Sequence, residues 1–468
     1  MAGGFRPWWL AEALAREPAD GRSPPLSGDT RADLAIVGGG FTGLWTAILA
    51  KQARPELDVV LVEADICGAG ASGRNGGCVL TWTTKFMTLC RLYGEAEAVR
   101  LARASEQAIL DIEAFIDAHG IECDWRRDGT LYTATSNAQL GASDAVMGEL
   151  GRRGISTWTR LPDDEVRRRA GSRAHLEGWF SPLAATVQPA LLARGLRRVA
   201  LGLGVRIHEH TSMHGLGRGT PMTIATSGGT ITADRVVLAL NAWMAGLFAE
   251  LRRSIAIVSS DMVITEPAPA ALKATGLEGG ISVLDSRTFV HYYRSTPDGR
   301  LMLGKGGNTF AYGGRMHPVF DAPSPYRLPL AATVVRFMPG LAPTRIAASW
   351  NGPSDRSVTG LPFFGALAGR PNVWYGFGYS GNGVGPTRMG GQLLADLALG
   401  RDTAWTRSPL ARGPRGQFPP EPIRYLGSLL VRDAIRRTEA DADAGRVPRR
   451  WDAALARFAA AAGKADKA

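Results

Sequence analysis

The first strongly patterned stretch of the chain lies between residues 33 and 63. Asp33–Val37 is a short apolar run bounded by turn-forming residues, which is typical of a buried strand. Leu44–Gln52 has the length and composition of a helix, and Asp58–Glu63 (DVVLVE) forms a second apolar run. The glycine-rich turn Gly38–Gly43 connects the first strand to the helix. This order predicts a strand–helix–strand unit with two buried strands.

The rest of the chain alternates helical and strand-rich blocks. A helical pattern covers about 95–119, and a helix is expected from Pro189, where a missing N–H costs nothing. Residues 205–240 predict a strand, a hairpin and a further strand. FVHYYRS and RLMLGKG (289–306) form a second hairpin around the turn Thr-Pro-Asp-Gly. NVWYGFG (372–378) is another strand, and helices follow at 387–399 and in the tail from about 421.

The composition is typical of a globular protein with a basic surface. The 468 residues are 45% hydrophobic and 21% charged, which is enough for a large core in two or three domains. The net charge is +11, and the chain has only six lysines among 54 basic residues. Such a charge fits an anionic ligand or simply a solvated surface. Basic runs such as 167–169 lack the aromatic interleaving of a nucleic-acid binder, so we expect no nucleic-acid partner.

The pattern of the four cysteines argues against a structural metal site and against disulfide bonds. Cys67, Cys78, Cys90 and Cys123 form no CxxC pair and show no repeated spacing, which argues against zinc or any other structural metal and against a disulfide framework. We therefore expect a reducing, cytoplasmic compartment. The amino-terminal residues show no long apolar run after a basic start, so no signal peptide, membrane span or lipid anchor is expected.

The turn at 38–43 carries the most specific motif. Gly38, Gly40 and Gly43 match GxGxxG, in which the glycines allow the tight turn, the close approach of a pyrophosphate and the close packing of helix on strand. Glu63 ends the second strand twenty residues after Gly43, where an acidic side chain accepts hydrogen bonds from an adenosine ribose. A carboxylate there disfavours the 2′-phosphate of NADP. The motif predicts a dinucleotide without separating FAD from NAD.

Four segments together resemble the glycine oxidase, sarcosine oxidase and D-amino acid oxidase superfamily of FAD enzymes. They are the fingerprint with Glu63, GASGRNGG (70–77), VVLALNAW (236–243) and GFGYSGNGVGP (376–386). The resemblance covers about residues 32–400 and implies non-covalent FAD, since no cysteine lies in the late segment where some relatives attach the flavin. The residues that it assigns to FAD are Gly38, Gly40, Phe41, Thr42, Gly43, Glu63, Gly70, Ala71, Ser72, Arg74, Asn75, Gly76, Gly77, Met213, Asn241, Trp243, Gly378, Gly381, Asn382, Gly383 and Val384.

The recurrence of these segments along the chain predicts its organisation. We expect an α/β (α+β) fold with a discontinuous Rossmann-like FAD-binding domain and an inserted antiparallel β-sheet substrate domain. The expected ranges are an arm at 1–31, the FAD-binding domain at 32–95, 165–250 and 345–420, the substrate or cap domain at 96–164 and 251–344, and a helical tail at 421–468.

Longer segments suggest a narrower relationship. CGAGASGRNGGC, RRDGTLYTAT, ATVQPALLARGLRRVA and YYRSTPDGRLMLGKGGN are similar to the aminophosphonate oxidoreductase clade, associated with 2-aminoethylphosphonate use. α-Amino-acid oxidases of the superfamily hold the substrate carboxylate with two arginines. The aligned positions here are Ser354 and Gly381, and neither is cationic. An α-carboxylate substrate is therefore in doubt.

Other cations and aromatic residues are candidates for the substrate site. Arg74, Arg294, Lys305 and Arg356 are candidates for holding a substrate anion, because guanidinium matches an oxyanion in a fork and lysine acts as a point charge. Lys305 and Arg294 could equally be a strand-end lysine and a solvated rim charge. The candidates for an aromatic pocket are Tyr292, Tyr293, Tyr379 and Trp243. A lone strand histidine such as His291 has more often a structural role.

The resemblance implies oxidation of a small anionic amine, with 2-aminoethylphosphonate or its N-methyl derivative as best candidate. The products would be an aldehyde and ammonia or an alkylamine, with O₂ reduced to H₂O₂ or another electron acceptor used. No obligatory catalytic base is expected. The alternatives are a flavin dehydrogenase of a C–O bond, an oxidase of ordinary amino acids, or a basic RNA-binding flavoprotein. A nicotinamide-dependent reductase would need a second GxGxxG, which the chain lacks. The oligomeric state stays open.

Overall fold

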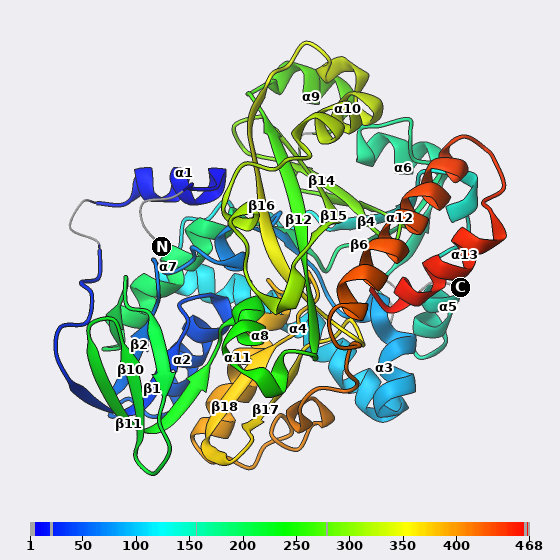
Figure 1. The fold of residues 1–468 in the computed structure, drawn as a ribbon. Coiled ribbons are helices and arrows are strands. Elements are labelled where there is room, and N and C mark those ends of the chain that lie inside the picture. Colours follow the sequence, from blue (N-terminus) through cyan, green and yellow to red (C-terminus); the bar gives the residue numbers. More distant parts are fainter. Residues whose placement is uncertain (1–4, 19–21, 156, 278, 463–465, 467–468) are drawn as a thin grey trace.

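Two eight-stranded sheets organise the chain (Figure 1). A computed structural model of the protein describes residues 5–18, 22–155, 157–277, 279–462 and 466. The first sheet lies with its helices in the lower part of Figure 1, and the second sheet stands above it. The mixed α/β architecture predicted from the sequence is confirmed.

The first sheet has the strand order β17-β18-β11-β1-β2-β8, and β10 and β9 extend it beside β11. The parallel strands are β1 (Thr30–Val37), β2 (Val59–Val62), β8 (Arg206–His208), β11 (Gly229–Leu238) and β18 (Arg370–Phe377). The antiparallel strands are β9 (Met213–Leu216), β10 (Met222–Thr226) and β17 (Phe363–Leu367). The carboxyl ends of β1 and β2 therefore meet at one edge, where ligands bind in sheets of this kind.

One expectation for this sheet was wrong. The sequence predicted a hairpin and then a separate strand in residues 222–240, whereas the second arm of the hairpin and the later strand form the single strand β11. In the structure Asp234, where the predicted break lay, is half-buried and pairs with Arg31 at 3.1 Å, and the strand continues through it. β11 pairs with β10 in its first half and with β18 in its second half.

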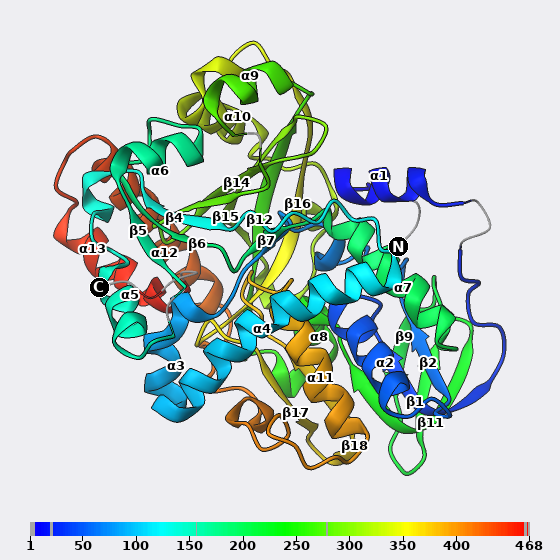
Figure 2. The same cartoon turned by 180° about the vertical axis from the view of Figure 1, so that it is seen from behind.

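Helices cover one face of this sheet, as the rear view shows (Figure 2). They are α2 (Phe41–Ala53), α4 (Glu95–His119), α7 (Pro189–Gly202) and α11 (Pro386–Ala398). Eleven of the thirteen residues of α2 are buried, because α7, α11 and the sheet surround it. α7 begins at Pro189 as predicted, and the Gln188 side chain caps it by accepting the Leu191 N–H at 2.8 Å.

The second sheet has the order β16-β12-β15-β14-β13-β4-β6-β5. Its strands are β4 (Thr130–Ala134), β5 (Thr159–Leu161), β6 (Glu177–Ser181), β12 (Ile255–Thr265), β13 (Ser282–Asp285), β14 (His291–Ser295), β15 (Leu301–Phe310) and β16 (Ile346–Ser357). All neighbours are antiparallel except β13 and β4. The hairpin predicted at 289–306 is present as β14 and β15.

Smaller elements surround the two sheets. The remaining helices are α1 (Trp8–Arg16), α3 (Phe86–Tyr93), α5 (Asp144–Arg152), α6 (Asp163–Ala170), α8 (Met244–Leu247), α9 (Pro269–Thr275), α10 (Arg327–Phe337), α12 (Ile423–Asp443) and α13 (Arg450–Ala456). A short ribbon joins β3 (Cys78–Val79) to β7 (Ala185–Thr186). α1 lies within the amino-terminal arm, and Trp9 packs edge-on against Trp350 of β16.

The predicted domain ranges stay a prediction, and the sheet pairing differs from them at two strands. β6 lies within the range 165–250, and β16 lies within 345–420, both assigned to the FAD-binding domain. Both strands pair in the second sheet. None of the helices in the described part of the chain is long and apolar enough to cross a membrane.

Candidate functional site

A cavity of about 450 Å³ has walls from both sheets. Its first wall is formed by the turn after β1, the end of β2, the loop at 69–78 and the segment after β11. Its second wall is formed by β12, β14 and β16, and the loop at 376–387 closes it. The predicted FAD residues that line it are Gly38, Gly40, Phe41, Thr42, Glu63, Gly70, Ala71, Ser72, Arg74, Asn75, Gly76, Met213, Asn241, Trp243, Gly381, Gly383 and Val384. Gly43, Gly77, Gly378 and Asn382 lie beside this wall in the chain but outside it.

The glycine turn at 38–43 places backbone atoms without side chains against the cavity. Gly38 has φ +112°, and a Cβ there would lie 2.5 Å from the Ala239 carbonyl oxygen. A Cβ on Gly43 would lie 2.0 Å from the Gly38 carbonyl oxygen, so only glycine lets helix and turn pack this closely. A Cβ on Gly40 would lie 2.9 Å from Ser72 Oγ, next to the cavity. The turn thus leaves room for a phosphate group against the backbone.

The amino-terminal end of α2 faces the same space. Gly40 provides no side-chain cap, so the positive end of the helix dipole is open toward the cavity. The Phe41 N–H donates to Ser72 Oγ at 2.8 Å, which ties the helix end to the loop at 69–78. Backbone N–H groups and a helix dipole together suit a pyrophosphate.

Glu63 lies at the end of β2 on the cavity wall. Its Oε2 accepts the Gly39 N–H at 2.8 Å, and its Oε1 accepts the Asp65 N–H at 3.0 Å. Burial raises the pKa of Glu63, and these two N–H donors oppose the rise. The carboxylate is held rigidly and keeps further lone pairs for ribose hydroxyls. Turn, helix end and carboxylate together fit the adenosine diphosphate part of FAD.

The loop at 70–77 is braced by its own side chains. Asn75 Oδ1 accepts the Gly77 N–H at 2.8 Å, and Asn75 Nδ2 donates to the Ser72 carbonyl oxygen at 2.8 Å. Arg74 donates to the carbonyl oxygens of Ala69 and Phe320 at 2.7 and 2.9 Å and to Asp321 Oδ1 at 2.7 Å. Arg74 therefore contacts the cavity while its guanidinium is bound to protein oxygens, and its predicted contact with a substrate stays a prediction.

Two of the three candidate tyrosines lie on the cavity. Tyr292 contacts Ser260 Oγ through its hydroxyl at 2.7 Å, and Tyr379 accepts a hydrogen bond from Thr42 Oγ1 at 3.0 Å. Tyr293 points to the opposite face of the second sheet, as strand alternation requires. Its hydroxyl donates to the Ala170 carbonyl oxygen at 2.7 Å and contacts His175 Nε2 at 2.8 Å.

Arg294 lies behind the 70–77 loop rather than on the cavity. Its Nε donates to the Gly76 carbonyl oxygen and its Nη2 to the Val187 carbonyl oxygen, both at 2.8 Å. The guanidinium also lies 4.9 Å from the centre of the Trp9 ring. Only 1% of Arg294 is exposed, so it is not the solvated rim charge considered from the sequence.

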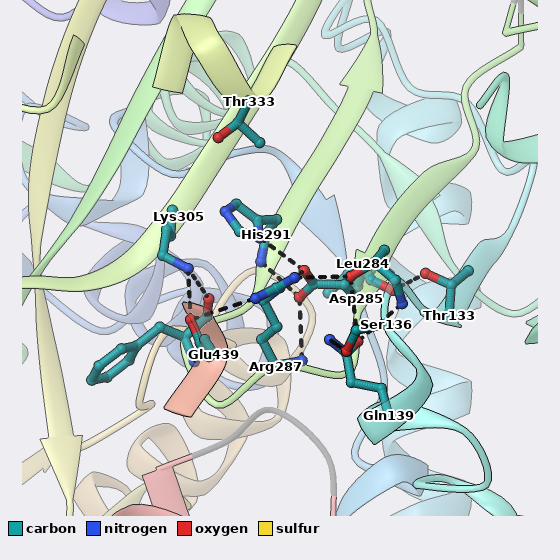
Figure 3. Close-up of polar contacts among 12 residues, drawn as sticks. Thr133, Ser136, Gln139, Leu284, Asp285, Arg287, His291, Lys305, Thr333 and Glu439 are labelled. Atoms are coloured by element: carbon teal, nitrogen blue, oxygen red, sulfur yellow. Dashed lines mark hydrogen bonds and ion pairs between the residues drawn. The ribbon is translucent and has the colours of Figure 1, made fainter. Parts of the chain in front are cut away.

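Lys305 and His291 belong to a buried ionic cluster outside the cavity wall (Figure 3). Lys305 Nζ donates to Glu439 Oε2 at 3.2 Å and to the Phe289 carbonyl oxygen at 3.0 Å. His291 Nδ1 contacts Asp285 Oδ2 at 2.8 Å, and Arg287 Nε donates to the same oxygen at 3.0 Å. Since Glu439 belongs to α12, the cluster fastens the carboxyl-terminal helix to the second sheet.

Arg356 is the predicted anion-binding residue that lines the cavity from the second sheet. Burial lowers the pKa of Arg356 to about 10. Ser354 lies two residues earlier on β16 and also lines the cavity. The neighbouring Asp355 accepts the N–H groups of Gly378 and Ser380, so it holds the closing loop in place. Burial raises the pKa of Asp355 to about 6.

Sequence reasoning missed Lys85. This residue ends a short 3-10 helix at Thr83–Lys85 and is only 4% exposed. Burial, together with repulsion from Arg356, lowers the pKa of Lys85 to about 8. The available signal was its rarity, because six lysines in 468 residues make each one unusual. Lys85 lies outside the cavity wall, whereas Ser260 and Cys78 line the cavity without having been singled out for it.

Comparisons with known proteins agree with this geometry. The family described as "DAO: FAD dependent oxidoreductase" matches residues 33–397. A probable oxidoreductase OrdL from Rhizobium meliloti is 30% identical over 84% of this chain and 89% of its own. Gamma-glutamylputrescine oxidoreductase from Escherichia coli is 28% identical over 92% of this chain and 98% of its own. The glycine oxidase structure from Geobacillus kaustophilus shares the fold, with a TM-score of 0.64 and 22% identity over 82% of this chain and 99% of that one.

Proposed function

Because the chain belongs to the DAO family of FAD-dependent oxidoreductases, we propose that it oxidises the carbon–nitrogen bond of a small anionic amine. The best candidate is 2-aminoethylphosphonate or its N-methyl derivative. Oxidation would give an imine, and hydrolysis would then give phosphonoacetaldehyde and ammonia or methylamine. Molecular oxygen, reduced to hydrogen peroxide, is the proposed acceptor, although another electron acceptor would serve the same chemistry.

The single observation that carries the proposal is the position of Arg356. It supplies a cation to the cavity wall, although the two positions aligned with the carboxylate-binding arginines are Ser354 and Gly381. The cation of this site therefore lies at a different position from the carboxylate-binding arginines. This favours a substrate whose anionic group lies at a different distance from its amine. The resemblance of four longer segments to the aminophosphonate oxidoreductase clade supports the same substrate class.

The remaining chemistry requires little from protein side chains. Bound FAD supplies the two-electron oxidation of a carbon next to an amine nitrogen. The ring of Tyr292 and the side chains of Met262 and Val290 give the cavity an apolar wall that excludes water. Such a wall favours the neutral form of the amine, whose lone pair assists the loss of hydride. The contact between Tyr292 and Ser260 fixes the ring so that the amine is held in one orientation.

The proposal also covers how FAD is attached to the protein and where in the cell the protein lies. We expect FAD to be bound without a covalent bond, although Cys78 lines the cavity. Acid precipitation should therefore release the yellow colour into the supernatant, and a yellow pellet would contradict this statement. A cytoplasmic location stays a prediction from the cysteine pattern.

The experiment that tests the function is anaerobic mixing of the FAD-loaded protein with a panel of amines, amino acids and hydroxy acids. We expect 2-aminoethylphosphonate or its N-methyl derivative to bleach the flavin fastest and to release ammonia or methylamine. Bleaching by hydroxy acids alone would overturn the amine assignment. Good turnover of α-amino acids, with no bleaching by aminophosphonates, would overturn the substrate class.

A further inference from the structure

Three features of the second wall converge on one point of the cavity. Ser354 and Arg356 are two positions apart on β16, so their side chains leave the same face of the strand. Arg356 Nη2 and Ser354 Oγ lie 3.5 and 3.4 Å from the position that a Gly381 Cβ would occupy. A Cβ on Gly306 of β15 would lie 3.4 Å from the same Arg356 nitrogen. Two glycines thus border one guanidinium and one hydroxyl, and neither adds a side chain to this part of the cavity wall.

Ser354 is the more informative of the two polar groups. It is 7% exposed, and its Oγ has no hydrogen-bond partner among the residues that the structure describes. A buried hydroxyl without a partner is costly, and such groups in native proteins usually await a ligand or water. Because Ser354 lines the cavity beside Arg356, a ligand oxygen that approaches its buried hydroxyl would satisfy it.

We propose that Arg356 and Ser354 form an oxyanion subsite that binds the three-oxygen tetrahedral anion of the substrate, a phosphonate in preference to a carboxylate. This inference rests on the proposed oxidation of an anionic amine and specifies how the anion is held. Arg356 donates to two oxygens as a fork, and Ser354 donates its hydroxyl hydrogen to the third. A carboxylate has only two oxygens, so it would leave one of these donors unsatisfied.

The charges around the subsite support a doubly charged ligand. Lys85 is a second buried cation, but it lies outside the cavity wall and its Nζ lies 4.0 Å from Asp466 Oδ1, so Arg356 is the cation that a ligand in the cavity would meet. The adjacent carboxylate of Asp355 is directed to the N–H groups of the closing loop. A doubly charged phosphonate next to the buried guanidinium of Arg356 would gain more from their attraction than a singly charged carboxylate.

The distinguishing experiment compares a charged and an uncharged amine on variants that are loaded with FAD. The substrates are 2-aminoethylphosphonate and propylamine, which have similar length. Arg356→Met should lower kcat/KM for the aminophosphonate at least about 30-fold and change that for propylamine less than about threefold. Arg356→Lys keeps the charge without the fork and should recover only part of the loss. Ser354→Ala should cost about 5- to 10-fold for the aminophosphonate alone.

Arg407→Met is the matched control, because Arg407 is exposed and pairs with Asp402 far from the cavity wall. It should behave as the unaltered protein. Equal losses for both amines in Arg356→Met, with normal flavin content, would overturn the subsite. If Arg356→Met does not fold, Arg356→Lys and Ser354→Ala decide the question by the same comparison.

A binding measurement keeps the subsite separate from the proposed reaction. Methylphosphonate, acetate and inorganic phosphate are titrated into the FAD-loaded protein while the flavin absorbance spectrum is recorded. We expect methylphosphonate to perturb the spectrum at lower concentration than acetate, and Arg356→Met to remove the difference. This result would support the subsite even if no amine were oxidised. Equal binding of acetate and methylphosphonate would overturn it even if amines were good substrates.

Discussion

At the scale of single residues, Arg294 shows how a buried charge acts through the backbone. Its guanidinium occupies the space behind the 70–77 loop, donates to the carbonyl oxygens of Gly76 and Val187, and stacks on Trp9. The loop that faces the cavity is therefore supported from the side of the amino-terminal arm. Arg294 connects helix α1, strand β14 and the proposed flavin loop through one side chain.

Replacing Arg294 with methionine should therefore act on stability and on the loop together. We expect the free energy of unfolding to fall by about 2–4 kcal/mol, because two buried carbonyl oxygens lose their donors. FAD affinity should fall in parallel. Urea unfolding and the release of flavin fluorescence measure the two effects. A variant with unaltered stability and a weaker KM for charged amines alone would instead make Arg294 a substrate-binding residue.

The tyrosines of β14 mark what residue patterns can and cannot predict. Alternation along His291–Ser295 correctly required Tyr292 and Tyr293 to face opposite sides of the sheet. The sequence did not specify which of them faces the cavity. Lys305 was equally undetermined, because its partner Glu439 lies 134 residues later in the chain. A local pattern cannot describe a pair of that separation.

At the scale of elements, α12 is fastened to the second sheet by ion pairs. Glu439 pairs with Lys305 at 3.2 Å (Figure 3). Arg287 donates a hydrogen bond to Asp443, one turn further along the helix. Apolar residues of α12 such as Leu426 and Leu430 are exposed to solvent. The burial of apolar side chains therefore contributes little to the attachment of this helix. The ion pairs then provide much of its attachment.

Glu439→Gln should loosen this helix before the rest of the molecule. Losing one charged hydrogen bond should cost about 1–3 kcal/mol. Amide hydrogen exchange in α12 should become faster, while exchange in β1 and β11 stays slow. Asp433→Asn on the same helix is the control, because Asp433 is half-buried and pairs with Arg432 and Arg436 of α12 itself rather than with the second sheet. Unchanged exchange in α12 of the Glu439 variant would contradict this account.

His175 bonds to two strands of the second sheet, and its protonation makes the stability of the protein depend on pH. Its ring contacts Thr133 of β4 at 2.8 Å and Tyr293 of β14 at 2.8 Å, and burial lowers its pKa to about 4. The unfolded chain has a pKa near 6.5 at this position, so it binds the proton more tightly than the folded protein does. This contribution to stability is therefore complete above about pH 6.5 and is lost as the pH falls toward 4.

Full protonation of His175 should cost up to about 3 kcal/mol. His175→Gln should flatten the dependence of stability on pH between about 4 and 6.5 by that amount. Urea unfolding at a series of pH values measures it. Unchanged pH dependence in the variant would show that other groups, such as the carboxylates, account for the acid sensitivity.

At the scale of the whole molecule, the prediction from sequence was accurate where structure is local. The strand–helix–strand unit at 33–63 and the hairpin at 289–306 follow from neighbouring residues. The second sheet does not, because its parallel pair β4 and β13 joins residues about 150 positions apart. The pairing of β6 and β16 in the second sheet likewise depends on residues far apart in the chain, and the sequence alone did not show it.

Since both walls of the cavity come from the two sheets, we expect FAD binding and global folding to be coupled. Free FAD at about one hundred times its dissociation constant should stabilise the folded protein by about 2.7 kcal/mol. Tm should therefore rise with FAD concentration, and fluorescence and circular dichroism should report the same transition. Two separate transitions, only one of them sensitive to FAD, would show that one sheet folds without the other.

The position of the glycine loop at 376–384 in the chain affects when FAD can bind during synthesis of the protein. It closes a cavity whose first wall begins at Val37, so the two ends of one binding site are made about 340 residues apart. At roughly 5–20 residues per second, synthesis of this interval lasts on the order of 17–70 seconds. During that time the nucleotide-binding turn has been synthesised, but the loop that closes the cavity has not. Cofactor capture is therefore a late event, completed when the last quarter of the chain has left the ribosome.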